Sequence, residues 1–162
     1  MMVDRVDFNI DGLDTLMAKL ETVSTDVRRK GGRAALRKAA NVIVEQAKAN
    51  ALRLDDPETG RSIADNVALR WNGRLFKRTG DLGFRIGVLH GAKLKDHPDK
   101  SQNAPTPHWR LLEFGTEKMR AQPIMRPAIE SSIELVTSTF TTEYEKYVDR
   151  AIRRAQRSGG SG

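Results

Sequence analysis

The sequence contains no cysteine, few aromatic residues and no long apolar run. Without cysteine, the chain has no disulfide, no thiol nucleophile and no thiolate metal ligand, which fits a reducing compartment. No stretch approaches the roughly 18 uncharged apolar residues of a membrane-spanning helix. Residues 1–5 also lack the apolar core of a secretory signal, so we expect a soluble protein that is made in a cytoplasm and has no membrane partner.

A recognisable catalytic or metal site is also missing. The histidines do not share one helix face, and no glycine-rich stretch has the spacing of a phosphate-binding loop. His97 with Asp96 and Asp99 would hold a metal only weakly, because neighbouring loop residues do not preorganise a site. The acidic residues at 55–58 favour a solvated turn over a pair of acid–base carboxylates. The prediction is a protein that is not an enzyme, with no catalytic residues, cofactor or metal.

Basic residues are what the chain has in excess: 28 Lys and Arg against 21 Asp and Glu give a formal net charge of +7. One group gathers at residues 28–38 and consists of Arg28, Arg29, Lys30, Arg33, Arg37 and Lys38. No aromatic residue interleaves with this group in the sequence, so it offers no stacking platform for single strands. We interpret it as a solvated or subunit-facing surface, with nonspecific contact with DNA as the alternative.

Apolar periodicity predicts three helices. The first spans about residues 12–22, and the second begins after a cap at Ser24 or Thr25 and continues to at least Ala47. Gly31 and Gly32 mark either a break in it or a place where another backbone comes close. The third begins at Pro127 and is about 45 Å long. Its apolar stripe would pack on the second helix or on a neighbouring subunit, and consists of Ile129, Ile133, Val136, Phe140, Tyr144, Tyr147 and Ala151.

The middle of the chain alternates in a way that is typical of strands. Residues 67–71 alternate, Asn72-Gly73 predicts a hairpin turn with a returning strand at 74–78, and residues 82–88 alternate again. The predicted fold class is α+β, with a small antiparallel sheet of three to four strands packed against N-terminal helices and one long C-terminal helix.

Two segments fall outside these elements. Residues 91–107 form a long polar loop, which is either functional or a tolerated surface insertion. Residues 158–162 have linker composition and are interpreted as a flexible tail or an added linker. We predict that the rest of the chain, residues 1–157, is a single domain.

The segment 108–128 is the most informative part of the sequence. Its apolar run at 109–114 is too short for a helix of normal length and indicates a buried strand or a single turn. Gly115 allows a sharp bend after it. Pro123 and Pro127 disfavour the helical region for Gln122 and Arg126, so the chain should cross the protein as an extended, stiff strap. Pro127 then fits the first turn of the last helix.

This segment resembles the small neck and tail-completion proteins of long-tailed bacteriophages, a family of the tail-component type. The resemblance rests on Leu-Glu-Phe-Gly-Thr at 112–116 and on Pro-Ile-Met-Arg-Pro-Ala at 123–128. Position 124 is Ile where an aromatic residue is frequent, and the loop 91–107 is long. The resemblance implies a structural virion protein, assembled in the bacterial host cytoplasm. It would form a homo-oligomeric ring, a hexamer in that family, at the head-proximal end of the tail, as a tail completion or terminator protein in head–tail joining.

The partners implied are the tail tube and the neck or connector proteins. Two alternatives remain, a head-side connector component and a nucleic-acid-binding module on the basic residues at 28–38, whose affinity would fall with salt. The candidate strap and interface residues are Trp109, Glu113, Phe114, Gly115, Arg120, Pro123, Met125, Arg126 and Pro127. Among them Trp109, Phe114, Met125 and Pro127 should hold the strap to the core, while Glu113, Arg120 and Arg126 are candidates for charged pairs within or between subunits.

Overall fold

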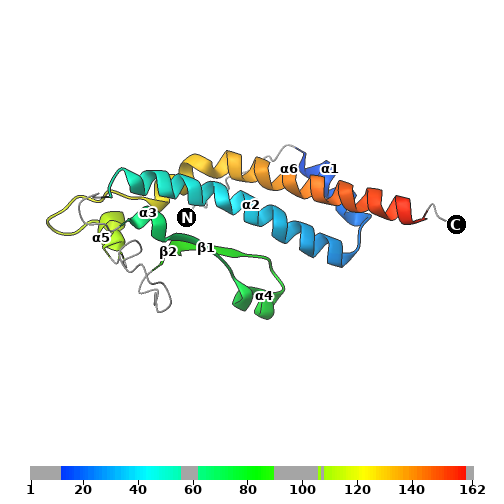
Figure 1. The fold of residues 1–162 in the computed structure, drawn as a ribbon, viewed down its shortest axis with the longest axis horizontal. Helices are drawn as coiled ribbons and strands as arrows, with labels where there is room; N and C mark the ends of the chain where they lie inside the picture. The colour runs from blue at the N-terminus through cyan, green and yellow to red at the C-terminus, as the bar shows by residue number, and fades with distance from the viewer. Residues whose placement is uncertain (1–11, 56–61, 90–105, 107, 160–162) are drawn as a thin grey trace, which may run out of the picture.

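Two long antiparallel helices form the axis of the molecule, α2 (Thr25–Leu52) and α6 (Met125–Gly159). The computed structural model describes residues 12–55, 62–89, 106 and 108–159. The short helix α1 (Leu13–Glu21) lies on α6, and a small sheet lies on the opposite side of α2 (Figure 1). Ser24 caps α2 as predicted, since its Oγ accepts a hydrogen bond from the N–H of Val27 at 3.3 Å. The three predicted helices are therefore confirmed.

Small residues let α2 and α6 approach closely. The buried residues of α2 are all glycine, alanine or valine, and α6 meets them with Ala128 and Ser132 near its start. At the other end, the rings of Tyr144 and Tyr147 lie over Gly31 and Gly32. The helix α2 continues through this glycine pair, so the predicted break is wrong, and what comes close to the glycines is tyrosine side chains and not another backbone.

Replacing Gly31 by alanine should destabilise the protein by about 1 kcal/mol, although alanine is the better helix former by about the same amount. A Cβ at Gly31 would lie 2.6 Å from Cδ1 of Tyr147 and 3.1 Å from Cε2 of Tyr144, so both rings must move. Urea unfolding measures the change. The exposed Ala34 provides the control: Ala34→Gly reports helix propensity alone, and a Gly31→Ala protein stabilised by as much as Ala34→Gly is destabilised would refute the close packing.

The apolar stripe predicted for α6 is wrong in its first part. Ile129 and Ile133 are 48% and 36% exposed, whereas their small neighbours Ala128 and Ser132 are buried. The distance between two helix axes is set by the side chains at the contact, and the small residues of α2 leave room only for small partners. Further along, Tyr144 and Val148 are buried against α1 and α2, together with Leu16 and Ala35.

The sheet has two strands among the described residues, β1 (Val67–Trp71) and β2 (Phe84–Val88), instead of the three to four predicted. They are antiparallel, with Val67 opposite Val88 and Trp71 opposite Phe84. A short helix, α3 (Ile63–Asn66), leads into β1. The inner face of the sheet packs under α2 in the larger apolar cluster, which also contains Val44, Ile63 and Ile124.

The predicted returning strand is instead the helix α4 (Gly73–Thr79), which forms the tip of the hairpin (Figure 1). Asn72 is responsible, because its side-chain oxygen accepts a hydrogen bond from the N–H of Leu75 at 3.2 Å and so caps a helix. Gly80 ends this helix with a φ of 79°. The backbone N–H of Asn72 then bonds to the carbonyl of Gly83 at 2.9 Å, which closes the loop into β2.

Two predicted segments lie only partly within the residues that the structure describes. Of the predicted loop 91–107 only Thr106 is described, and its buried hydroxyl accepts a hydrogen bond from the Asn66 amide at 2.9 Å. Ser158 and Gly159, predicted to begin a flexible tail, are the last residues of α6.

Within the described ranges, none of the helices combines the length and apolar character needed to cross a bilayer.

Candidate interaction surface

The segment predicted as a strand or single turn is a six-residue helix, α5 (Trp109–Phe114). Its helical spacing turns Trp109, Leu112 and Glu113 toward the protein and leaves Leu111 and Phe114 outside, 52% and 68% exposed. The prediction that Phe114 anchors the strap in the core is therefore wrong. In a strand-like run all of the apolar residues could have been buried, but a short surface helix buries one face only.

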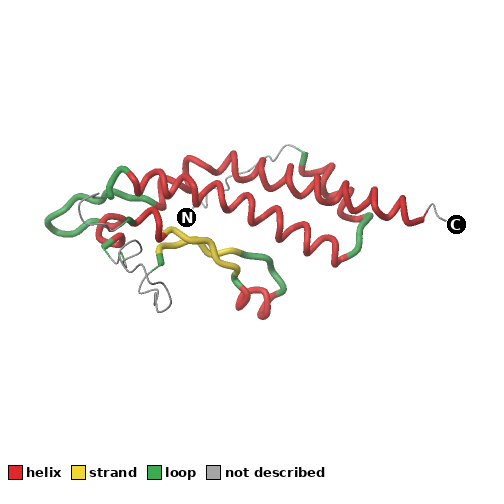
Figure 2. Tube along the Cα trace, in the orientation of Figure 1, coloured by secondary structure: helices red, strands yellow, loops and turns green. Residues whose placement is uncertain are grey.

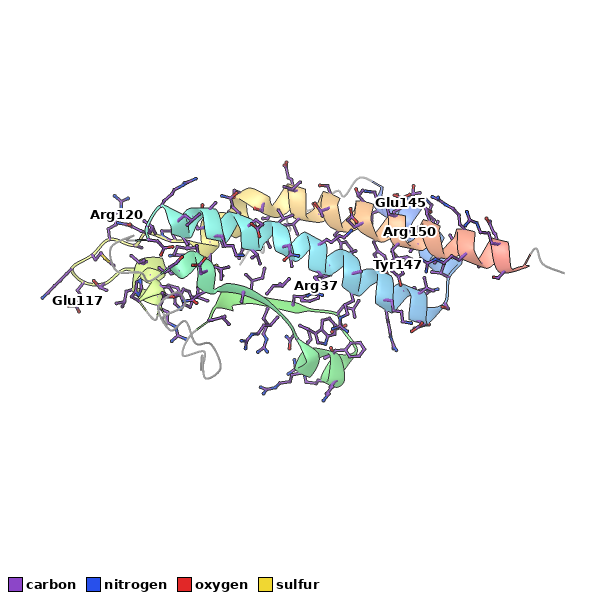
Figure 3. The ribbon with its side chains drawn as sticks, viewed as in Figure 1. Arg37, Glu117, Arg120, Glu145, Tyr147 and Arg150 are labelled. Carbon is purple, nitrogen blue, oxygen red and sulfur yellow. The ribbon has the colours of Figure 1, made fainter. Side chains whose placement is uncertain are left out.

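Gly115 ends α5 in a backbone conformation that residues other than glycine rarely adopt. Its φ and ψ are 74° and 177°, so the predicted sharp bend is present. The chain then turns at Thr116 and Met119 and returns alongside α5, where the N–H of Gln122 donates to the carbonyl of Leu112 at 2.7 Å. Figure 2 shows this loop between α5 and α6 at one end of the molecule. Arg120 lies on this loop (Figure 3) and is exposed.

The carboxylate of Glu113 holds the start of α6. It is buried, and its Oε2 accepts from the backbone N–H groups of Ile124 and Met125 at 2.6 and 2.9 Å. Its Oε1 accepts from the backbone N–H of Arg126 at 3.1 Å and from the guanidinium Nε at 3.3 Å. The first N–H groups of a helix have no partner within the helix, so this carboxylate acts as a cap supplied by α5. The extended conformation predicted for Arg126 is wrong because these bonds draw it into the first turn, ahead of Pro127.

The same contacts keep Glu113 ionised. Burial alone raises the pKa of a carboxyl group, but the three backbone N–H groups and the Arg126 guanidinium favour the charged form. The result is that the pKa of Glu113 is lower than its usual value of 4.5. Glu113 and Arg126 thus form a charged pair within one chain, the first of the two possibilities left open for them.

Beside this cap lies an apolar groove of about 320 Å³. Residues from four elements line it: Ile43 of α2, Ile86 of β2, Trp109 and Phe114 of α5, and Met125 and Ile129 of α6. The Arg126 guanidinium lies 5.6 Å from the centre of the Phe114 ring and borders the groove. The indole N–H of Trp109 is buried without an acceptor in the described part of the chain. Such a surface can hold apolar side chains of another protein.

The structure brings together candidates that the sequence only placed close along the chain. Trp109, Phe114 and Met125 share the groove, while Gly115, Pro123 and Pro127 shape the backbone around it. Sequence reasoning missed Ile43 and Ile86 as site residues, because they come from distant elements with ordinary core patterns. The sequence pattern places Ile129 in the buried stripe of α6 instead. Its helical position one turn after Met125 is the only signal in the sequence that it lines the groove.

Four of the six residues of the predicted basic surface make side-chain contacts within the chain, of two kinds. Lys30 is paired with Asp26 at 2.9 Å and Lys38 with Glu143 of α6, so neither is free to bind a ligand without breaking an ion pair. Arg29 and Arg33 instead turn to the hairpin, where their guanidinium groups lie 5.9 Å from the Phe76 ring and 4.2 Å from the Trp71 ring. Aromatic residues do accompany this basic group, but they come from the hairpin.

Acidic residues also take structural positions. Asp55, predicted to lie in a solvated turn, accepts hydrogen bonds from the N–H groups of Ile63 and Ala64 at 2.8 and 3.1 Å and so caps α3. Among the residues that the structure describes, no group of three His, Asp or Glu side chains could hold a metal ion. His97, Asp96 and Asp99 lie outside these residues.

The comparison with family models identifies the class of protein as a phage tail-associated structural component. Residues 14–115 match the family described as "Bacteriophage HK97-gp10, putative tail-component", and this is more than half of the chain. The protein belongs to this family. The resemblance stated from residues 108–128 is confirmed, although the match itself ends at Gly115 and does not include the start of α6. Comparisons with curated proteins and with solved structures found no match.

Proposed function

We propose that this protein completes the phage tail by forming a homo-oligomeric ring at its head-proximal end. In this role it is a virion protein that is assembled in the host cytoplasm and contacts the tail tube on one side and neck or connector proteins on the other. Family membership supports a structural tail role, and the apolar groove supports self-association. A hexamer is the ring size that the resemblance favours.

The observation that carries the proposal is the open apolar groove with Phe114 at its edge. A phenylalanine that is 68% exposed at the edge of a groove lined by Ile43, Ile86 and Ile129 is typical of a surface that another protein covers. Ile133 follows Ile129 by one helical turn and extends this surface along α6. The groove thus has the character of one half of an interface.

An exposed leucine on another side of the same chain makes another copy the best occupant. Leu135 of α6 is 57% exposed and, at roughly 100° per residue, lies on the opposite side of the helix from Ile133. Because the groove and Leu135 lie on different sides, they favour a head-to-tail contact, in which the groove of one copy receives the Leu135 side of the next. Such heterologous contacts form a ring when the rotation between neighbouring copies closes on itself.

Phe114→Ser and Leu135→Ser should each convert the ring into smaller species that remain folded, because both side chains are exposed in the single chain. Sedimentation velocity measures the assembly and circular dichroism the melting. Leu52→Ser is the matched control, since Leu52 is as exposed as Phe114 but does not line the groove. The proposal fails if Phe114→Ser assembles like the native protein, or if Leu52→Ser dissociates the ring equally.

A head-side connector component is the alternative position for the same ring, and the fold does not decide between them. The two positions differ in which particles bind the purified ring. Binding to tails that lack heads supports tail completion, whereas binding to filled heads that lack tails supports the connector role.

A further inference from the structure

The hairpin that joins β1, α4 and β2 has a strong excess of positive charge. We call residues 67–88 the basic hairpin; its cations are Arg70, Arg74, Lys77, Arg78 and Arg85. Asp81 is its single acidic residue. All five cations are exposed, and none forms an ion pair within the described residues. The fold therefore leaves this charge unneutralised.

Two of these cations face each other across the sheet. Arg70 and Arg85 are directly opposite in the antiparallel register, on the face that points away from α2. Like charges in this position repel each other and destabilise the pair of strands. An anion bound between them would remove this repulsion, so the arrangement is better suited to a bound chain than to the free protein.

The tip of the hairpin extends the same surface. Gly73, Arg74, Lys77 and Arg78 of α4 line an open, shallow concavity. The helix is held in place by Trp71, whose ring packs on Phe76 and Phe84 at centroid distances of 5.7 and 5.3 Å. The cations are thus presented from a rigid base, which lowers the entropy lost when they bind a ligand.

A cluster of acidic residues lies on the other side of the molecule. Glu143, Glu145 and Asp149 are on α6, where they pair with Lys19 and Lys38. The helix α2 separates α6 from the sheet (Figure 1). Arg33 and, one helical turn later, Arg37 add positive charge to the side of α2 that faces the hairpin (Figure 3). The side of the molecule that carries the hairpin is therefore basic.

We propose that the basic hairpin binds the phosphate backbone of duplex DNA, independently of sequence. Arginine predominates, and its planar guanidinium group matches the geometry of phosphate oxygens. The Trp71 ring is covered by Arg33 and by its aromatic neighbours, so it is not free to stack on unpaired bases. Contacts made only to phosphates position a protein on DNA without reading the bases. This activity is separate from ring formation and does not depend on the apolar groove.

The test uses the full chain and a labelled DNA duplex of about 30 base pairs, with affinity measured by fluorescence anisotropy between about 50 and 200 mM salt. The variant Arg74→Gln/Lys77→Gln/Arg78→Gln removes the cations of α4. Arg153→Gln/Arg154→Gln/Arg157→Gln removes the same charge from exposed positions at the end of α6 and is the matched control. Arg85→Glu is a third variant, which replaces a repulsive cross-strand pair by an attractive one.

The native protein should bind the duplex with an affinity that falls steeply with salt. The α4 variant should bind at least about 10-fold more weakly and reduce the salt slope by about three, while the α6 control changes both much less. Arg85→Glu should weaken binding although its melting temperature is unchanged or higher, which separates the effect from misfolding. Equal losses in the α4 variant and the α6 control would overturn the proposal. So would competition by polyglutamate as effective as by unlabelled duplex, which would indicate an acidic protein partner.

Discussion

Glu113→Ala should lower the free energy of unfolding by about 3–5 kcal/mol, because it leaves buried backbone donors without an acceptor. The N–H groups of Ile124, Met125 and Arg126 all depend on this carboxylate, and Ile124 is completely buried. The loss should begin at the first turn of α6 and spread to the apolar groove, since Met125 and Ile129 belong to both. Urea unfolding measures the free energy.

Two further variants make this prediction specific. Glu113→Gln keeps the shape but exchanges one acceptor oxygen for an amide donor, so its loss should be intermediate. Glu117→Ala removes an exposed carboxylate from the loop after α5 (Figure 3) and should change stability by no more than about 0.5 kcal/mol. If the alanine variants at 113 and 117 were equally stable, Glu113 would not be the cap of α6.

The contribution of the Glu113 cap to the stability of the protein should also depend on pH. The pKa of Glu113 is lower in the folded chain than its usual value of 4.5, so its contribution is fully present above pH 4.5. The contribution is lost as the pH falls through the folded pKa, because protonation then favours the unfolded chain. Below pH 4.5 the stability of the native protein should therefore fall more steeply than that of the Glu113→Ala variant.

Gly115→Ala should cost about 3 kcal/mol or more, through backbone strain and a steric clash that cannot relax. A Cβ at this position would lie 2.8 Å from the backbone N of Ala121 and 3.0 Å from the carbonyl oxygen of Met119. Both atoms belong to the loop that returns to α6, so the loop itself would have to move. Differential scanning calorimetry measures the loss as a lower melting temperature.

Gly80→Ala is the control for a positive φ without a steric contact. Gly80 has a similar φ of 79°, but an added Cβ would have nothing within 4 Å. We expect a smaller loss there, of about 1 kcal/mol. A Gly115→Ala protein that is no less stable than Gly80→Ala would show that the close backbone contact between residues 115 and 121 is absent.

The helices could be predicted because their signals are local. Ser24 caps α2, and the apolar spacing of α1 and α6 needs no knowledge of the partner. The tip of the hairpin could not be predicted, since Asn72-Gly73 can form either a tight turn or the start of a helix. In the structure, where the helix forms, Trp71 packs against Phe84 and Arg33, which are distant in the sequence. The apolar periodicity also gave a wrong prediction of burial for Ile129. It shows which residues are apolar but not how little space α2 leaves beside α6.

The candidate surface was predictable only in part, for the same reason. Trp109, Phe114 and Met125 were singled out as neighbours of a bend and a helix start, which the short segment 108–128 encodes by itself. That Phe114 is exposed follows from the helical form of α5, which an apolar run of that length does not specify. The contribution of Ile43 and Ile86 depends on the tertiary fold, and no local pattern distinguishes them from other core residues.

The mass of the purified protein across a concentration series, measured by light scattering without DNA in low and high salt, tests ring formation most directly. We expect a discrete ring-sized species built from 18.1 kDa chains, which persists in high salt because apolar contacts hold it together. A protein that stays monomeric at every concentration and salt level would contradict the ring.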